Sequence, residues 1–65
     1  MASHHDAQLS AIAASVDELA RRVATLAEQL QDDGQAEPAT ALFEVERSLR
    51  MAERSLDRSR RSLQP

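Results

Sequence analysis

Apolar residues recur along the first half of the chain at alternating intervals of three and four residues. The series is Leu9, Ile12, Val16, Leu19, Val23, Leu26 and Leu30. This spacing places the side chains on one stripe of an α-helix, at positions a and d of a heptad repeat that begins with Leu9 at a. The pattern therefore predicts an amphipathic helix over about residues 5–32.

The second half repeats the spacing with a d series that shrinks from valine to alanine to serine. The series is Leu42, Val45, Leu49, Ala52, Leu56, Ser59 and Leu63. It predicts a second helix over about residues 37–63, with leucine at every a position. The triplet Arg-Ser-Leu, which occurs at 47–49, 54–56 and 61–63, follows from this repeat. Leucine packs at a, serine lies at the preceding g, and arginine faces outward at f.

Gly34 and Pro38 interrupt the pattern between the two halves. Glycine is favoured just past the end of a helix, and proline suits the first turn of a new one. A turn over about residues 33–36 makes the helices antiparallel neighbours, so the chain is expected to be an all-α, antiparallel two-helix hairpin of coiled-coil type. One continuous helix conflicts with this pair of residues. The alternative is an extended chain that swaps its second helix with another copy.

Small residues beside the a/d stripe permit the helices to approach closely. They occupy position e of the first helix and position g of the second, as Ala13, Ala20 and Ala27, and as Ala41, Ser48, Ser55 and Ser62. If Gly34 is near the centre of the turn, the leucines of the second helix meet d residues of the first. The expected pairs are Leu26 with Leu42, Leu19 with Leu49, and Ile12 with Leu56.

A chain of 65 residues without cysteine has few ways to become stable alone. Disulfides are impossible, and a single hairpin leaves most of its apolar stripe half exposed. We therefore predict that two hairpins pair into a homodimeric four-helix bundle. The residues expected to carry this self-association are Leu19, Val23, Leu26, Leu42, Leu49 and Leu56. A monomeric hairpin and a complex with the helices of another protein are the alternatives.

The charge of the chain is unevenly distributed. The net charge is −3, from 8 arginines and 11 acidic residues. Residues 1–33 carry six acids and two arginines, which gives −4, and residues 34–65 carry five acids and six arginines, which gives +1. An acidic half and a basic half in one chain favour pairing within the chain or between copies.

The arginines of the second helix form a stripe outside the a/d positions. One reading is a solvated surface with ion pairs along each helix. The candidate pairs are Asp17–Arg21, Glu18–Arg22, Glu44–Arg47, Glu46–Arg50, Glu53–Arg50 and Asp57–Arg61. The other reading is a docking patch for an acidic or helical protein. Its residues would be Phe43, Arg47, Arg50, Met51, Arg54 and Arg58. A nucleic-acid or nucleotide-phosphate site on the same arginines is the alternative, although the chain is net acidic and poor in aromatic residues.

The sequence contains no recognisable catalytic motif. It has one glycine, so it lacks a phosphate-binding loop, and it has neither cysteine nor lysine as a nucleophile. His4 and His5 are adjacent, which does not place them on one helical face as a metal pair. No stretch approaches the ~20 apolar residues of a membrane span. We expect a non-enzymatic cytoplasmic protein without cofactor or metal, which acts as an adaptor, regulator or assembly subunit through contacts between helices.

Overall fold

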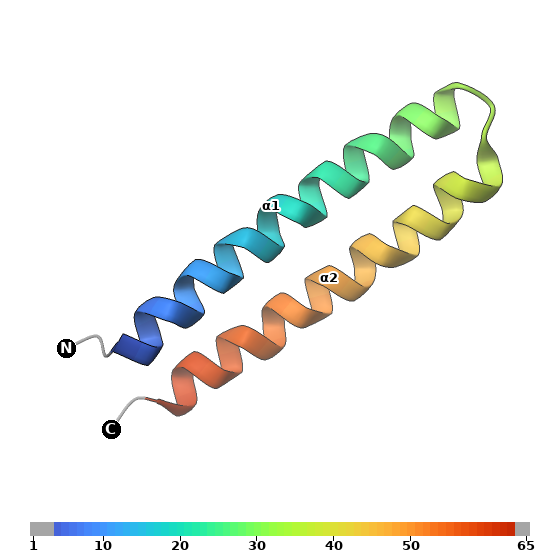
Figure 1. Ribbon diagram of the computed structural model, residues 1–65. Helices are drawn as coiled ribbons and strands as arrows, with labels where there is room; N and C mark the ends of the chain where they lie inside the picture. The colour runs from blue at the N-terminus through green and yellow to red at the C-terminus, as the bar shows by residue number, and fades with distance from the viewer. Residues whose placement is uncertain (1–3, 64–65) are drawn as a thin grey trace.

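The structure, a computed structural model, describes residues 4–63 as two helices joined by a tight turn. Helix α1 comprises His4–Asp32, and α2 comprises Ala36–Ser62. The helices lie side by side and run in opposite directions, so the two ends of the chain lie at the same end of the molecule (Figure 1). The helical hairpin expected from the sequence is therefore confirmed, and residues 4–63 contain no strand.

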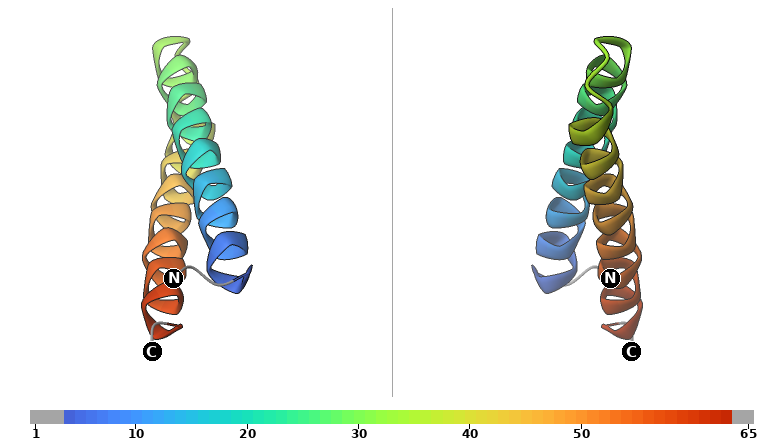
Figure 2. Two further views of the ribbon diagram at one scale, coloured as in Figure 1. Left: turned by 90° about the vertical axis from the view of Figure 1, so that its left-hand side faces the viewer. Right: turned by 90° about the vertical axis from the view of Figure 1, so that its right-hand side faces the viewer.

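The hairpin is a rod one layer thick. Its principal extents are 50 × 14 × 9 Å. Viewed edge-on, the helices cross at a shallow angle and separate toward the end that carries the termini (Figure 2). Because there is no second layer, nothing within residues 4–63 covers either broad face of the rod.

Gly34 ends α1 with a pair of backbone hydrogen bonds. The amide of Gln35 donates to the carbonyl of Leu30 at 2.8 Å, and the amide of Gly34 donates to that of Gln31 at 3.1 Å. These two bonds form a Schellman motif, which satisfies carbonyls that the helix end leaves without partners. The motif needs a left-handed residue at Gly34, whose φ is +80°.

Pro38 lies in the first turn of α2, where its lack of an amide hydrogen does no harm. The first amides of a helix have no carbonyl partner within the helix. The amide of Ala39 makes the first bond of this turn, to the carbonyl of Gln35 at 3.2 Å. No side chain caps α2, since Gln35 makes no side-chain cap hydrogen bond. Gly34 and Pro38 thus end one helix and permit the next, with three residues between them.

The contact between α1 and α2 is centred on positions a and e. Ala20, Ala27 and Ala39, all at e, are fully buried, while the leucines and valines at a within α1 and α2 are half-buried. The d residues that the sequence pattern placed opposite α2 leucines, such as Leu19 and Leu26, are exposed. Two helices approach most closely where their side chains are smallest, and here those positions are the alanines at e.

We expect Gly34→Ala to lower the free energy of unfolding by about 1 kcal/mol through backbone strain alone. A β-carbon at this position would meet no other atom within 4 Å, so crowding adds nothing. Urea unfolding at one fixed protein concentration measures the change. Gly34→Asn is the control, because asparagine tolerates the left-handed conformation better and should lose less stability. Equal stability of the alanine variant and the unmodified protein would contradict the role of the turn.

Candidate functional site

A single hairpin buries no large side chain. The buried hydrophobic residues of the described chain are three alanines, Ala20, Ala27 and Ala39. A leucine contributes about 1.5–3 kcal/mol when it is removed completely from water. The leucines at position a within the two helices are only half-buried, so much of this free energy is not gained in the isolated hairpin.

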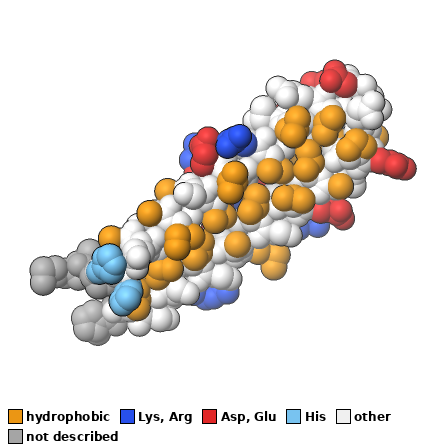
Figure 3. Space-filling view, in the orientation of Figure 1, with side chains coloured by type: hydrophobic (Ala, Val, Ile, Leu, Met, Phe, Trp, Pro, Cys, Tyr) orange, Lys and Arg blue, Asp and Glu red, His pale blue; other side chains and the backbone are white. Residues whose placement is uncertain are grey.

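The exposed d residues of both helices lie on one broad face. Ile12, Leu19 and Leu26 of α1 are 48%, 45% and 48% exposed, and Val45 of α2 is 43% exposed. Antiparallel helices that meet at a and e direct both d columns to the same side of their contact. A band of hydrophobic side chains runs along this face over both helices (Figure 3). We name the surface formed by columns a, d and g of α1 and α2 the apolar face.

Charged residues are nearly excluded from the apolar face. Although the chain has 8 arginines and 11 acidic residues, Arg22 is the only one of them in columns a, d and g of the two helices. Polar residues there are mostly small, as in Ser48, Ser55 and Ser62 at g of α2. Leu19, Val23, Leu26 and Arg22 line a shallow groove on this face. Depletion of charge around an apolar centre is typical of the core of a protein interface.

The opposite face carries the ion pairs between the helices. A guanidinium nitrogen of Arg50, Nη1, lies 2.6 Å from Oδ1 of Asp17 and 2.7 Å from Oε1 of Glu53. Asp17 also accepts a hydrogen bond from Arg21. Asp17 and Arg50 both occupy position b, so their contact places the b columns together and the d columns on the other side. Near the termini, Nε of Arg60 lies 3.4 Å from Oδ1 of Asp6.

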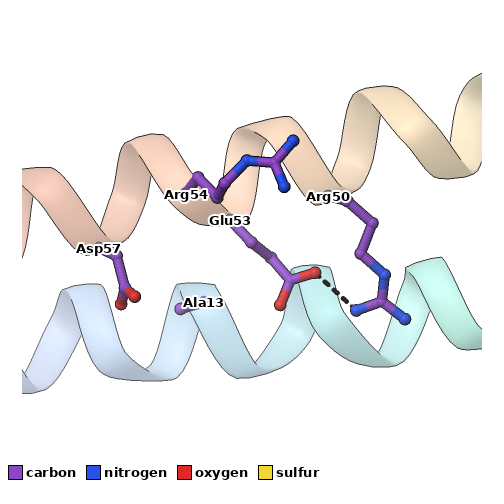
Figure 4. Close-up of a pocket in the computed structure, with 5 residues that line it drawn as sticks. All are labelled: Ala13, Arg50, Glu53, Arg54 and Asp57. Carbon is purple, nitrogen blue, oxygen red and sulfur yellow. Dashed lines mark hydrogen bonds and ion pairs between the residues drawn. The ribbon is translucent and has the colours of Figure 1, made fainter.

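Ala13 of α1 leaves room for longer side chains of α2 on this face. Ala13, Arg50, Glu53, Arg54 and Asp57 line a shallow pocket (Figure 4). Arg50, Glu53 and Asp57 extend toward α1, whereas Arg54 lies over α2 and does not reach toward α1. Because position 13 has only a methyl group, the carboxylate of Glu53 can lie beside α1 and receive the hydrogen bond from Arg50.

Hydrogen bonds shift the pKa values of the Asp17 cluster. The bond from Arg21, and after it the bond from Arg50, holds the pKa of the Asp17 carboxyl below its ordinary value. The bond to Asp17 is also the main reason that the pKa of Arg21 and that of Arg50 are raised. Each shift favours the charged form, so the cluster stays ionised at neutral pH.

The structure brings the six predicted self-association residues to the apolar face. Leu19 and Leu26 are exposed on it. The other four lie half-buried at position a along its centre line, as Val23, Leu42, Leu49 and Leu56.

The six predicted partner-binding residues fall into two separate groups. Phe43 and Arg50 are half-buried at position b, on the side of the ion pairs, and Arg50 is engaged by Asp17. The other four are exposed on the outside of α2, at positions c and f, as Arg47, Met51, Arg54 and Arg58.

Sequence reasoning anticipated ion pairs within a helix better than those between helices. Asp17–Arg21, Glu46–Arg50 and Glu53–Arg50 form as expected. Asp57 lies near Arg60 instead of Arg61, and the other two candidate pairs, Glu18–Arg22 and Glu44–Arg47, do not form within residues 4–63. Asp17–Arg50 and Asp6–Arg60 link the two helices and were missed, because they depend on the register of α1 against α2. The alanines at position e were the signal in the sequence that α1 and α2 meet at positions a and e, and that their contact is rotated from the a/d stripe toward position b.

The described residues offer no arrangement for metal binding. Among residues 4–63, no group of three or more His, Asp or Glu side chains is placed to hold a metal ion. The rings of His4 and His5 lie 5.9 Å apart and are tilted by 56°. Neither described helix combines the length and the apolar character needed to cross a membrane.

Comparison of the chain with known protein families, curated proteins and solved structures gave no significant match. The candidate site therefore rests on the chemistry and geometry of this chain. Of the two broad faces, the apolar one is uncovered and almost free of charge, and the other is occupied by the ion pairs.

Acidification is expected to remove the contribution of Asp17 to stability. The pKa of Asp17 is lower in the folded protein than in the unfolded chain. The contribution of Asp17 to the free energy of unfolding is therefore complete at pH values above the ordinary carboxyl pKa of about 4, and it is lost as the pH falls through the lowered pKa of the folded protein. Asp17→Asn should therefore be less stable at neutral pH and lose less stability on acidification. Thermal unfolding followed by circular dichroism at pH values of about 7 and about 3 measures both effects.

The control for this test is Glu28→Gln. Glu28 is an exposed carboxylate on α1 that makes no ion pair among the described residues. This variant should follow the acid profile of the unmodified protein. An Asp17→Asn variant with that same acid profile would show that the Asp17 cluster does not contribute to folding.

Proposed function

We propose that the protein is a small non-enzymatic interaction module that self-associates through its apolar face. Two hairpins would pack face to face as a four-helix bundle, with columns a and d of all helices in the common core. The observation that carries the proposal is a nearly charge-free apolar face on a hairpin that buries no large side chain. Its biological role would be that of an adaptor, regulator or assembly subunit.

The accessible surface supports this pairing. A compact monomer of this mass exposes about 4,100 Å² by the usual scaling of surface with mass. The hairpin exposes 4891 Å², which is roughly 800 Å² more than a compact monomer. This excess is about the area that each partner buries in a standard protein interface. Covering the apolar face would thus bring the exposed surface per chain into the range of a compact protein.

A second copy of the chain is the partner that fits this face best. In a two-fold dimer the same patch serves both sides, so an apolar face meets an apolar face. The serines at g of α2 are small enough to let another helix approach, and Arg22 is long enough to extend past the edge of the contact. The acidic first half and the more basic second half also attract each other when α1 of one hairpin lies beside α2 of the other.

The double variant Leu19→Gln, Leu26→Gln should dissociate the dimer. Each half-exposed leucine has about 1 kcal/mol left to gain on burial, and a dimer contains four of them, so the dissociation constant should rise about a thousandfold. Sedimentation equilibrium of the full chain over about a hundredfold range of concentration measures the mass of each protein. The unfolding temperature should rise with concentration for the dimeric unmodified protein and stay constant for the monomeric double variant. The unmodified protein should sediment as a dimer.

Met51→Gln is the matched control. Met51 is 56% exposed, more than either leucine, but it lies on the outside of α2 at position c. This variant should keep the mass of the unmodified protein. A helical monomer that persists in the unmodified protein at the highest concentration would overturn the proposal. A poorly helical monomer would do the same and would indicate that helices of another protein complete the fold.

A further inference from the structure

The outer surface of α2 carries a second row of residues at alternating intervals of three and four. The row follows columns f and c, and all of its members are exposed. We name these residues the outer row: Arg47, Met51, Arg54, Arg58 and Arg61. On a straight helix these residues lie along one line on the helix surface. Arg47 and Arg61 are separated along the helix axis by about 21 Å, at 1.5 Å per residue.

The arginines of the outer row do not use their charge within the hairpin. Arg47, Arg54 and Arg61 make no ion pair with any residue in the described part of the chain. Arg58 donates a hydrogen bond to the neutral hydroxyl of Ser55 at 2.9 Å. Arg50 and Arg60, by contrast, are bound to carboxylates of α1. The positive charge of the row is thus available to an external anion.

Met51 supplies the row with an apolar centre. It is the most exposed of the large hydrophobic residues that the structure describes, at 56%. Arg47 and Arg54 flank it along α2 at intervals of four and three residues. Methionine and arginine are both enriched at protein interfaces, and an exposed methionine between arginines offers an apolar contact beside charged groups.

The outer row would remain accessible after the hairpin dimerises. Positions c and f point away from positions a and d on the same helix. Arg54 lines the pocket on the ion-pair side beside Arg50 and Glu53, and Figure 4 shows it lying over α2 without reaching toward α1. The row and the apolar face can therefore act independently, and a defect in one does not imply a defect in the other.

We infer that the outer row binds an acidic amphipathic helix of another protein, which lies along α2. Arginines at f recur every seven residues, or about 10.5 Å, and acidic residues at heptad spacing on a second helix match this repeat. An extended strand fits the row less well than a helix. The 10.5 Å repeat covers about three strand residues, so the side chains that meet successive arginines would point to opposite faces of the strand. Carboxylates on one helical column can pair with the guanidinium groups, while an apolar residue between them covers Met51.

A nucleic acid fits the row less well. The phosphates of a duplex wind around its axis, whereas the outer row is a straight line on one helix. Aromatic residues that could stack on bases are absent from the row. The net charge of −3, which combines −4 on residues 1–33 with +1 on residues 34–65, would also oppose a polyanion.

The test uses a labelled helical peptide of about three heptads, with glutamate at two adjacent heptad columns and one leucine placed opposite Met51. Fluorescence anisotropy of this peptide with the full-length protein measures binding. A second peptide of identical composition has its glutamates distributed around the helix. We expect the first peptide to bind at least about tenfold more tightly than the second, because only the first aligns its carboxylates with the row.

Variants of the protein locate the binding site. Arg54→Ala should weaken the first peptide about tenfold, since a hydrogen bond between charged groups is lost. Arg21→Ala is the matched control, because Arg21 is an exposed arginine at position f of α1, outside both the outer row and the apolar face, and Asp17 stays paired with Arg50 when Arg21 is removed. Its removal should leave the affinity unchanged. Met51→Gln should weaken the peptide about fivefold through the lost apolar contact. Circular dichroism shows whether each variant keeps its helices.

Three outcomes would overturn the inference. Equal loss of affinity in Arg54→Ala and Arg21→Ala would mean that the peptide responds only to the overall charge of the protein. Tighter binding of a labelled DNA or RNA oligonucleotide than of the peptide would assign the row to nucleic acid. Growth of the mass beyond a dimer at low salt, abolished by Arg54→Ala, would mean that the row binds the acidic helix of another copy. Peptide binding that persists when the protein is monomeric would separate this site from the proposed self-association.

Discussion

Two helices alone cannot surround a leucine, and the rest of this structure follows from that constraint. A side chain between two parallel cylinders has neighbours on two sides and water on the others. The hairpin reduces its exposure by bringing the helices together at alanines, so that Ala20, Ala27 and Ala39 are buried. This close approach turns the d columns of both helices to one face. The apolar face is thus a geometric consequence of the alanine contact.

Ion pairs select the register of the hairpin more than they stabilise it. Exposed pairs contribute little to the free energy of folding. Arg50, however, reaches carboxylates on both helices and contacts Asp17 across the interface. Sliding α1 by one residue along α2 would separate this pair and move the alanines away from their contact. The charges therefore occupy the one broad face where they can discriminate between registers, and they leave the other face free for apolar residues.

The sequence predicts the elements of this fold better than the rotation of each helix. The spacing of apolar residues predicts both helices, and Gly34 and Pro38 predict the turn, because these signals are local. A heptad pattern marks a stripe, but the part of the stripe that meets the first neighbour depends on how many helices share the core. In a four-helix bundle positions a and d point to the centre, whereas in one hairpin the small residues at e meet first.

The same dependence on neighbouring helices explains why some residues of the candidate site could be predicted from the sequence and others could not. The leucines of the apolar face could be identified from their spacing, which does not depend on the neighbouring helix. The exposure of Met51 and the unpaired charge of Arg54 could be inferred from the outward positions c and f. The half-burial of Phe43 could not, because position b is outward in an a/d contact and lies at the edge of an a/e contact. Such residues change their environment with a small rotation of the helix.

The shrinking d series of α2 bears on how two apolar faces could meet. Along α2 the d residues diminish from Val45 through Ala52 to Ser59, while those of α1 stay large. The apolar face is consequently thicker near the turn than near the termini. Two such faces keep a constant separation when the thick end of one covers the thin end of the other, which favours hairpins stacked in opposite directions. Stacking in the same direction would crowd the end near the turn and leave a gap at the end near the termini, and filling that gap would require the helices to bend. The serines of α2 therefore do more than permit a close approach, because their position along the helix favours one stacking direction in the proposed dimer.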